Sequence, residues 1–243
     1  MRFLIVVFVV VAGCGANTRP SPPFAVPTTG EPIGNPTNGA SQEPTAEPEA
    51  RVDPTVGAQG FTVDVESDAA SYAVVIENPN AIAVSRFINV SIAFLDAEGT
   101  VLATEMQNVN GMLAQSETAV AGDASLSGDA TNMEVEISLL NGLPSPMGAT
   151  LGENGDYEYR DVESVSDEGI RTTGAIVSRF ASEQINVPIH VVYYDAAGDV
   201  VGGAATLVDQ VLPGTEVTFE ATTLIAVPDI AETRVFGQIG FGE

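Results

Sequence analysis

The chain has 243 residues and a formal net charge of −25, from 33 acidic residues against 8 basic ones. All the basic residues are arginine, and this excess of negative charge disfavours binding to nucleic acid or to anionic lipid headgroups, which need a basic face. The 44% hydrophobic content suffices for a folded core, and the length allows one or two domains. Because the sequence contains one cysteine, it predicts no internal disulfide.

The N-terminal residues have the pattern of a secretory signal. Arg2 precedes an apolar run from Phe3 to Val11, which is followed by two small residues. The run is shorter than the roughly 20 residues that a membrane-spanning helix needs, although an uncleaved anchor is an alternative. Residues 11–14, Val-Ala-Gly-Cys, resemble the bacterial lipobox. That resemblance implies a lipoprotein signal peptide over 1–13, cleavage before Cys14 and lipid attached to its sulfur.

The segment after Cys14 predicts a tether. Residues 14–57 are rich in Pro, Thr, Gly, Asn and Glu and show no apolar period. Such a composition favours disorder, since it cannot bury enough apolar surface to form a core. We therefore expect a lipidated cysteine and a disordered linker, acting either as a spacer from the membrane or as a simple junction.

The next segment, 58–147, has short alternating apolar and polar runs separated by turn residues, and no long helical period. This pattern predicts strands and an immunoglobulin-like β-sandwich. The expected strands are 61–65, 71–77, 88–94, 101–104, 118–121 and 133–139.

The last segment, 148–243, has the same character and predicts a second sandwich. The expected strands begin or lie at 157–162, 171–177, 185–193, 200–201, 217–221 and 234–241. Pro188 interrupts the third of these. Because proline lacks an N–H, this part of the strand should lie at a sheet edge or a bulge.

A repeated hairpin relates the two segments. Asp96-Ala-Glu-Gly99 recurs 99 positions later as Asp195-Ala-Ala-Gly198, with an apolar strand on each side. The aspartate of such a turn accepts backbone N–H groups, and the glycine supplies the positive φ. A fixed offset over a strand, a turn and a second strand indicates a tandem repeat. A calcium loop at Asp96, or at Asp195 and Asp199, would need more oxygen ligands than these turns offer.

The second segment resembles the FxLYD domain family through Tyr193-Tyr194-Asp195, Gly198, a Leu-Pro-Gly turn at 212–214 and Phe219. The first segment keeps Phe-Leu-Asp at 94–96 but has Ala-Gln for Pro-Gly at 114–115, so it is a diverged copy. The resemblance implies an all-β fold of two tandem immunoglobulin-like sandwiches and a bacterial or archaeal envelope lipoprotein. The family has no shared catalytic residues, so the resemblance implies no activity.

The sequence offers few residues for chemistry. His190 is the sole histidine, and strand alternation predicts that it faces solvent. No nucleophile elbow or phosphate-binding loop occurs. We therefore expect no catalytic, metal-binding or cofactor-binding residue, and Cys14 is the one predicted site, for lipidation.

These observations predict a membrane-anchored lipoprotein outside the cytoplasm, a non-catalytic module that binds or positions another envelope protein. Its partners would be the membrane, through Cys14, and another envelope protein, but not nucleic acid. The alternative is an envelope hydrolase or metal-dependent enzyme with an unrecognised site. That alternative requires a cleft with converging polar groups, near His190 or between the domains. A plain spacer without a ligand is a third interpretation.

Overall fold

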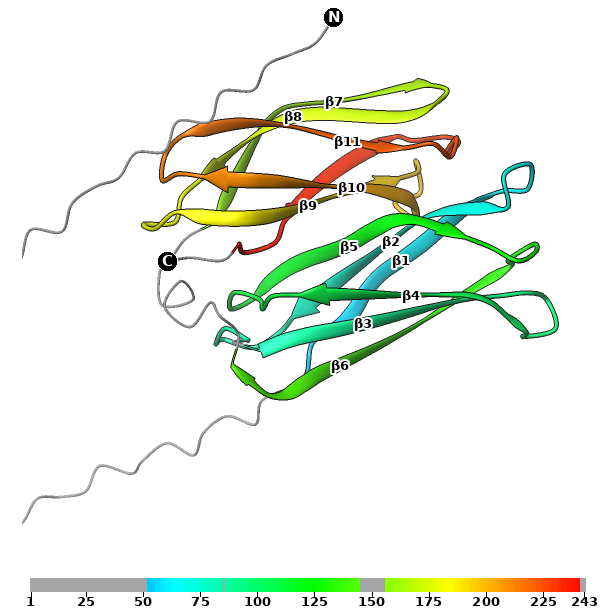
Figure 1. Cartoon of the computed structure of the whole chain (residues 1–243), viewed down its shortest axis with the longest axis horizontal. Coiled ribbons are helices and arrows are strands. Elements are labelled where there is room, and N and C mark those ends of the chain that lie inside the picture. Colours follow the sequence, from blue (N-terminus) through cyan, green and yellow to red (C-terminus); the bar gives the residue numbers. More distant parts are fainter. Residues whose placement is uncertain (1–51, 85, 145–155, 241–243) are drawn as a thin grey trace, which may run out of the picture. The chain divides into compact units, whose positions relative to one another are not determined.

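The computed structural model describes residues 52–84, 86–144 and 156–240. Across these ranges the chain is all-β, with twelve strands in four three-stranded antiparallel sheets (Figure 1). The predicted signal peptide, Cys14 and nearly all of the predicted linker lie outside the described residues. The all-β prediction is therefore confirmed for the part of the chain that forms the two repeats.

The first sandwich contains strands β1 to β6. One sheet has the order β1-β2-β5 and the other the order β4-β3-β6. The strands are β1 (Thr55–Asp64), β2 (Ala69–Asn78), β3 (Arg86–Leu95), β4 (Val101–Val109), β5 (Ser116–Ser125) and β6 (Asn132–Pro144). The first of them begins at Thr55, inside the segment expected to be linker, because its pairing with β2 extends to Glu77.

The second sandwich contains strands β7 to β12, with sheet orders β11-β8-β7 and β10-β9-β12. The strands are β7 (Tyr157–Asp167), β8 (Gly169–Ser178), β9 (Gln184–Tyr194), β10 (Val200–Val211), β11 (Glu216–Thr223) and β12 (Glu232–Gly237). Adding six to each strand number of the first sandwich reproduces these orders. The duplicated sequence therefore folds into a duplicated topology.

Each sandwich encloses its own apolar core. In the first, the Tyr72 and Phe61 rings each meet the Phe94 ring edge-on, with centroids 5.6 Å apart. In the second, the Tyr157 and Phe180 rings meet in the same way at 5.2 Å. Such edge-to-face contacts stabilise an aromatic pair beyond the burial of its area.

The repeated hairpins are turns, as predicted. Oδ1 of Asp96 accepts the N–H groups of Glu98 (3.0 Å) and Thr100 (2.7 Å). Oδ1 of Asp195 accepts the equivalent pair, with distances of 2.8 and 2.9 Å. The following glycines have φ of 82° and 86°. These backbone bonds lower the pKa of Asp96, and they occupy one oxygen of each carboxylate.

Pro188 corrects one expectation, because β9 is the central strand of its sheet and not an edge. The proline is tolerated since β12 ends at Gly237, opposite Ile189, so the ladder needs no N–H from residue 188. The carbonyl of Pro188 still accepts the Gln238 N–H at 2.8 Å.

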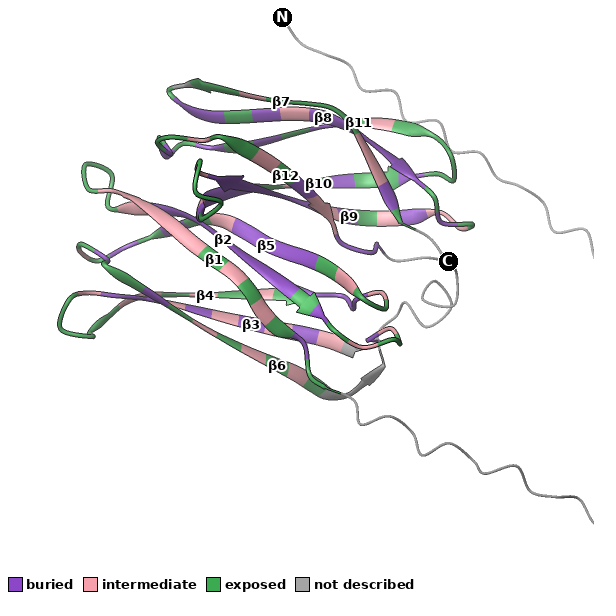
Figure 2. Ribbon diagram, turned by 180° about the vertical axis from the view of Figure 1, so that it is seen from behind, coloured by how far each residue is buried: buried purple, intermediate pink, exposed green. Residues whose placement is uncertain are grey.

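The two sandwiches pack through a third apolar cluster, which we call the seam. It joins β2 and β5 of the first sandwich to β9 and the start of β10 of the second, through Ala73, Val75, Ala119, Ala121, Val192, Tyr194 and Val200. Both faces of β2 and β9 are therefore buried, and buried residues run along β2 and β5 in Figure 2. Gly203 allows this approach, since a Cβ there would meet the Cβ atoms of Ala121 and Ala73 at 2.7 and 2.9 Å.

Candidate functional site: a groove at the seam

His190 lies in the seam and not on the surface, so the expectation that it faces solvent was wrong. Its exposed fraction is 6%, because the outward face of β9 is covered by β5 of the first sandwich. Strand alternation identified the outward face correctly but could not reveal that a second sheet covers it.

The contacts of His190 hold the two sandwiches together. Its Nδ1 accepts the Ala121 backbone N–H at 3.0 Å, which leaves the proton of the neutral ring on Nε2. That Nε2 lies 3.1 Å from Nε2 of Gln238, which is also a donor, so no hydrogen bond joins these two nitrogens. Burial lowers the pKa of His190 to about 4, against the opposing effect of the Ala121 bond. The imidazole is therefore neutral near pH 7 and serves as a buried acceptor for a backbone group.

Other polar bonds cross the seam beside His190. The Ser71 hydroxyl donates to the Gly203 carbonyl at 2.7 Å and accepts the Gly203 N–H at 2.9 Å. The Thr223 hydroxyl donates to Oδ1 of Asp123 at 2.6 Å, and burial raises the pKa of that aspartate. These bonds fix the register of the two sandwiches, because each satisfies polar groups that apolar packing alone would leave unpaired.

A groove of roughly 250 Å³ opens at one end of the seam. Both sandwiches contribute to it: the loop from β4 and the start of β5 on one side, the start of β7 and the segment after β12 on the other. Its lining residues are Gly111, Met112, Leu113, Gln115, Ser116, Glu117, Thr118, Asp156, Tyr157, Phe180, Gly237, Gln238 and Ile239.

Three residues of this groove carry a buried side-chain oxygen without a hydrogen-bond partner in the protein: Oγ1 of Thr118, the Tyr157 hydroxyl and Oε1 of Gln238. The exposed fractions of these residues are 7, 5 and 2%. Burial raises the pKa of Tyr157; the nearby Gly240 backbone opposes this rise, although it does not reach hydrogen-bond geometry. Within the described ranges, Gln184 is the one other residue with such an atom.

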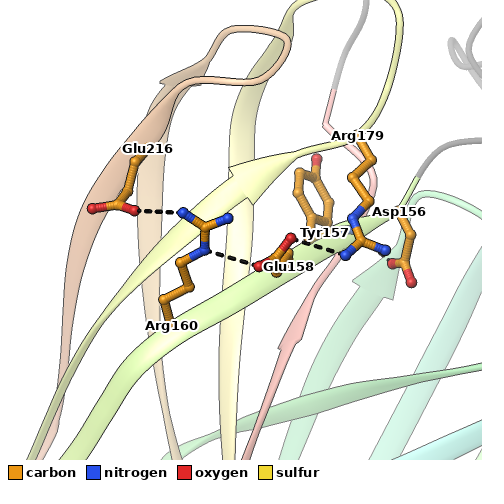
Figure 3. A network of polar contacts seen from close by, with 6 residues as sticks. All are labelled: Asp156, Tyr157, Glu158, Arg160, Arg179 and Glu216. Atoms are coloured by element: carbon orange, nitrogen blue, oxygen red, sulfur yellow. Dashed lines mark hydrogen bonds and ion pairs between the residues drawn. The ribbon is translucent and has the colours of Figure 1, made fainter.

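The outer sheet of the second sandwich carries an ion-pair network that begins beside the groove (Figure 3). Glu158 accepts from Nε of Arg160 at 2.9 Å and from Arg179 at 2.8 Å, and Arg160 also reaches Glu216 at 3.2 Å. The hydrogen bonds from Arg160 and Arg179 lower the pKa of Glu158 to about 2. The side chains are substantially exposed, so water and salt screen these pairs.

The sequence did not identify the groove residues as a site. Thr118 lies in β5, Tyr157 begins β7 and Gln238 follows β12, so the three are far apart in the chain, and no motif links them. Tyr157 was recognised only as the start of a strand. The tandem repeat was the one usable signal, since ligand sites favour the junctions between domains.

The described residues contain no group of three or more His, Cys, Asp or Glu side chains placed to hold a metal ion. Among the same residues, no helix is long and apolar enough to cross a membrane.

Comparison with known proteins gives limited information. No family model matches the chain, and no curated protein sequence matches it significantly. The exo-chitosanase CsxA of Amycolatopsis orientalis is similar in structure, with 15% identity over 76% of this chain and a TM-score of 0.26. This chain covers 26% of that enzyme. The tandem CBM22-1–CBM22-2 domain of Paenibacillus barcinonensis Xyn10C has 12% identity, covers 78% of this chain and 86% of its own, and has a TM-score of 0.17. Function must therefore be argued from the residues themselves.

Proposed function

We propose that this protein is a lipid-anchored, non-catalytic module outside the cytoplasm, whose paired sandwiches bind or position another envelope component. Cys14, at the end of the lipobox-like residues, would carry the lipid, and the Pro-rich segment up to about residue 57 would separate the folded part from the membrane. The resemblance to FxLYD domains supports the same setting.

The observation that carries the proposal is the seam. Apolar packing and polar bonds join the two repeats, so the position of one outer sheet relative to the other is fixed. The outward surfaces of both of these sheets remain free to contact a partner. A preorganised surface of this kind favours a role in binding or positioning, because ordering it costs nothing further at the moment of binding. The sole histidine is engaged in the seam, which favours binding over acid–base chemistry.

The anchor is tested by replacing Cys14 with serine and fractionating the cells. We expect wild-type protein in the membrane fraction and C14S in the soluble fraction, because the variant lacks the sulfur that would carry lipid. Serine at position 116, which lies in the folded part, offers a control: S116A should remain with the membrane. Retention of C14S on the membrane would overturn the lipid anchor.

The binding role is tested by photo-crosslinking in intact cells, with a photoreactive residue at Met106 or at Leu224. These side chains are 57 and 76% exposed and belong to different sandwiches. Mass spectrometry should identify one envelope protein in the adducts from at least one position, and C14S should reduce its yield. Background adducts alone at both positions would favour a plain spacer.

A further inference from the structure

We propose that Asn89 is an attachment site for an N-linked glycan, joined to its Nδ2 atom through the anomeric carbon of the first sugar. The inference rests on the proposed function only in placing the folded part outside the cytoplasm, and it concerns neither the lipid anchor nor the envelope partner. Three observations carry it: the residues at 89–91, the sheet on which they lie and the surroundings of the Asn89 amide.

Residues 89–91, Asn-Val-Ser, form an acceptor triplet for N-glycosylation, which is Asn, any residue except proline, and then Ser or Thr. It is the only such triplet among the 243 residues, since the run that begins at Asn35, Asn-Pro-Thr, has proline in the middle. Because a motif this short also arises by chance, its place in the fold decides whether it can serve as a site.

The Asn89 side chain lies on the outer face of the first sandwich. Along β3, Ile88, Val90 and Ile92 are fully buried in the core. Asn89 and Ser91 alternate with them and are half-buried on the other face of the strand (Figure 2). That face belongs to the β4-β3-β6 sheet, which is not the sheet that the first sandwich places in the seam. The amide and the hydroxyl of the triplet therefore point to the same open side.

The surroundings of Asn89 are small, uncharged and open to solvent. Its neighbours across the sheet are Asn108 of β4 and Ser138 of β6, and both are exposed. Nδ2 of Asn89 donates to Oδ1 of Asn108 at 3.4 Å, which is longer than a typical hydrogen bond. This contact needs one of the two amide hydrogens, and an N-linked amide keeps one hydrogen. A glycan on Nδ2 therefore breaks no buried hydrogen bond.

The equivalent sheet of the second sandwich has no acceptor triplet. Position 188, which lies 99 residues after Asn89, is proline, and His190 beside it is covered by β5 in the seam. A glycan on this face of β9 would keep the two sandwiches apart. On β3 it would instead cover a sheet that no other sheet of the described chain covers, and it would keep a second molecule from packing there. Of the two equivalent sheets, the triplet occurs in the one that can carry a sugar.

The transfer joins Nδ2 of Asn89 to the anomeric carbon of a sugar carried on a lipid pyrophosphate, in a step catalysed by a transferase of the cell. The new C–N bond replaces the bond between that carbon and the phosphate oxygen. The lipid pyrophosphate leaves with the bonding electrons, and the proton lost from Nδ2 passes to a base of the transferase. Because β4 and β6 pair with the triplet on both sides, its backbone is inaccessible in the folded chain. The transfer therefore precedes folding of the first sandwich.

The test is mass spectrometry of the full chain, purified from its own cells and digested with a protease. We expect the peptide that contains Asn89 to carry an added mass equal to one or more sugar residues, and fragmentation should locate the first sugar on Asn89. Recovery of this peptide in unmodified form alone would overturn the proposal.

This measurement is separate from the test of the anchor. If C14S moves to the soluble fraction as expected while the Asn89 peptide of the wild type is unmodified, the glycan fails and the anchored module stands. If the peptide carries sugar while C14S stays on the membrane, the glycan stands and the lipid anchor fails.

Three variants test whether the triplet directs the modification. Asn89→Gln keeps a side-chain amide but removes the acceptor, so the added mass should be lost completely. Asn108→Gln makes the same change beside it on the same face, and Ser91→Thr keeps a hydroxyl that completes the triplet; both should retain the added mass. An added mass that persists in Asn89→Gln, or that disappears in Ser91→Thr, would contradict the assignment. If Asn89→Gln does not accumulate in the cells, the wild-type peptide decides.

Discussion

The two sandwiches share one topology, yet each places a different sheet in the seam. The first buries its β1-β2-β5 sheet there, while the equivalent β7-β8-β11 sheet of the second faces outward. The second buries its β10-β9-β12 sheet, while the equivalent β4-β3-β6 sheet of the first faces outward. The contact is therefore between unlike faces, and the duplication of the fold does not explain it.

Residues at equivalent positions account for the choice of sheet. His190 and Val192 of β9 lie in the seam, whereas their equivalents 99 positions earlier, Ser91 and Ala93 of β3, are half-buried on the outer sheet. In the first sandwich the covered sheet is β1-β2-β5, and Ser71 of β2 is buried there against Gly203 of the second sandwich. In both β3 and β9 the side chains that face the core are apolar, whereas the side chains on the outward face differ between the two strands.

The largest expected effect comes from placing a charge in the seam. Val192→Asp should lower the free energy of unfolding by about 4 kcal/mol, because the carboxylate would be buried without a partner. Ala93→Asp introduces the same carboxylate at the equivalent, half-buried position and should cost less than about 1 kcal/mol. Urea unfolding of the two variants measures the difference. Similar losses in both would mean that the seam is not the distinguishing feature of β9.

A smaller effect is expected at Ser71, whose hydroxyl makes two bonds to the backbone of Gly203. Ser71→Ala should lower the free energy of unfolding by about 2–3 kcal/mol, since a buried N–H and a buried carbonyl each lose a partner. Ser91→Ala, on the outer sheet, should stay within about 0.5 kcal/mol of wild type. If chemical denaturation finds the two variants equally stable, these bonds do not hold the seam.

The smallest expected effect is a pH dependence that involves His190. Its pKa is about 4 in the folded protein against an ordinary value of 6.5. The unfolded chain therefore binds more protons between these values, and stability that is complete above pH 6.5 declines as the pH falls toward 4. Between pH 7 and pH 5 the loss should be about 2 kcal/mol, measured by urea unfolding at each pH.

The matched variant for this prediction is His190→Asn, which keeps an oxygen acceptor for the Ala121 N–H but does not titrate. Because His190 is the sole histidine, no other side chain with an unperturbed pKa titrates across this range. The stability of the variant should be nearly constant from pH 7 to pH 5. A fall equal to that of the wild type would assign the pH dependence to carboxylates.

The sequence predicted the strands well. Each of the twelve observed strands overlaps a run that alternation and turn residues had indicated, because one face of each strand covers a local core. The hairpin turns at Asp96 and Asp195 followed from the same local chemistry. Cys14, the one predicted site, lies outside the described residues and stays a prediction.

Two predictions went wrong for one reason, namely that they concerned the neighbours of a strand and not the strand itself. His190 was expected to face solvent, and Pro188 was expected at an edge or bulge. The first depended on whether another sheet covers β9, and the second on where β12 ends. The groove residues Thr118, Tyr157 and Gln238 were missed in the same way, since only packing brings them to one place.

By itself, the sequence determined that this protein contains two related β-units, because side-chain alternation and turn geometry act over a few neighbouring residues. Only the tertiary structure decided which sheet of each unit is covered and where the unpartnered oxygens gather. Those outcomes depend on contacts between residues about 70 to 130 positions apart, such as Ala121 with His190 and Ser71 with Gly203. No local sequence pattern predicts such contacts, because each strand would form in the same way whether its outer face is exposed to solvent or covered by another sheet.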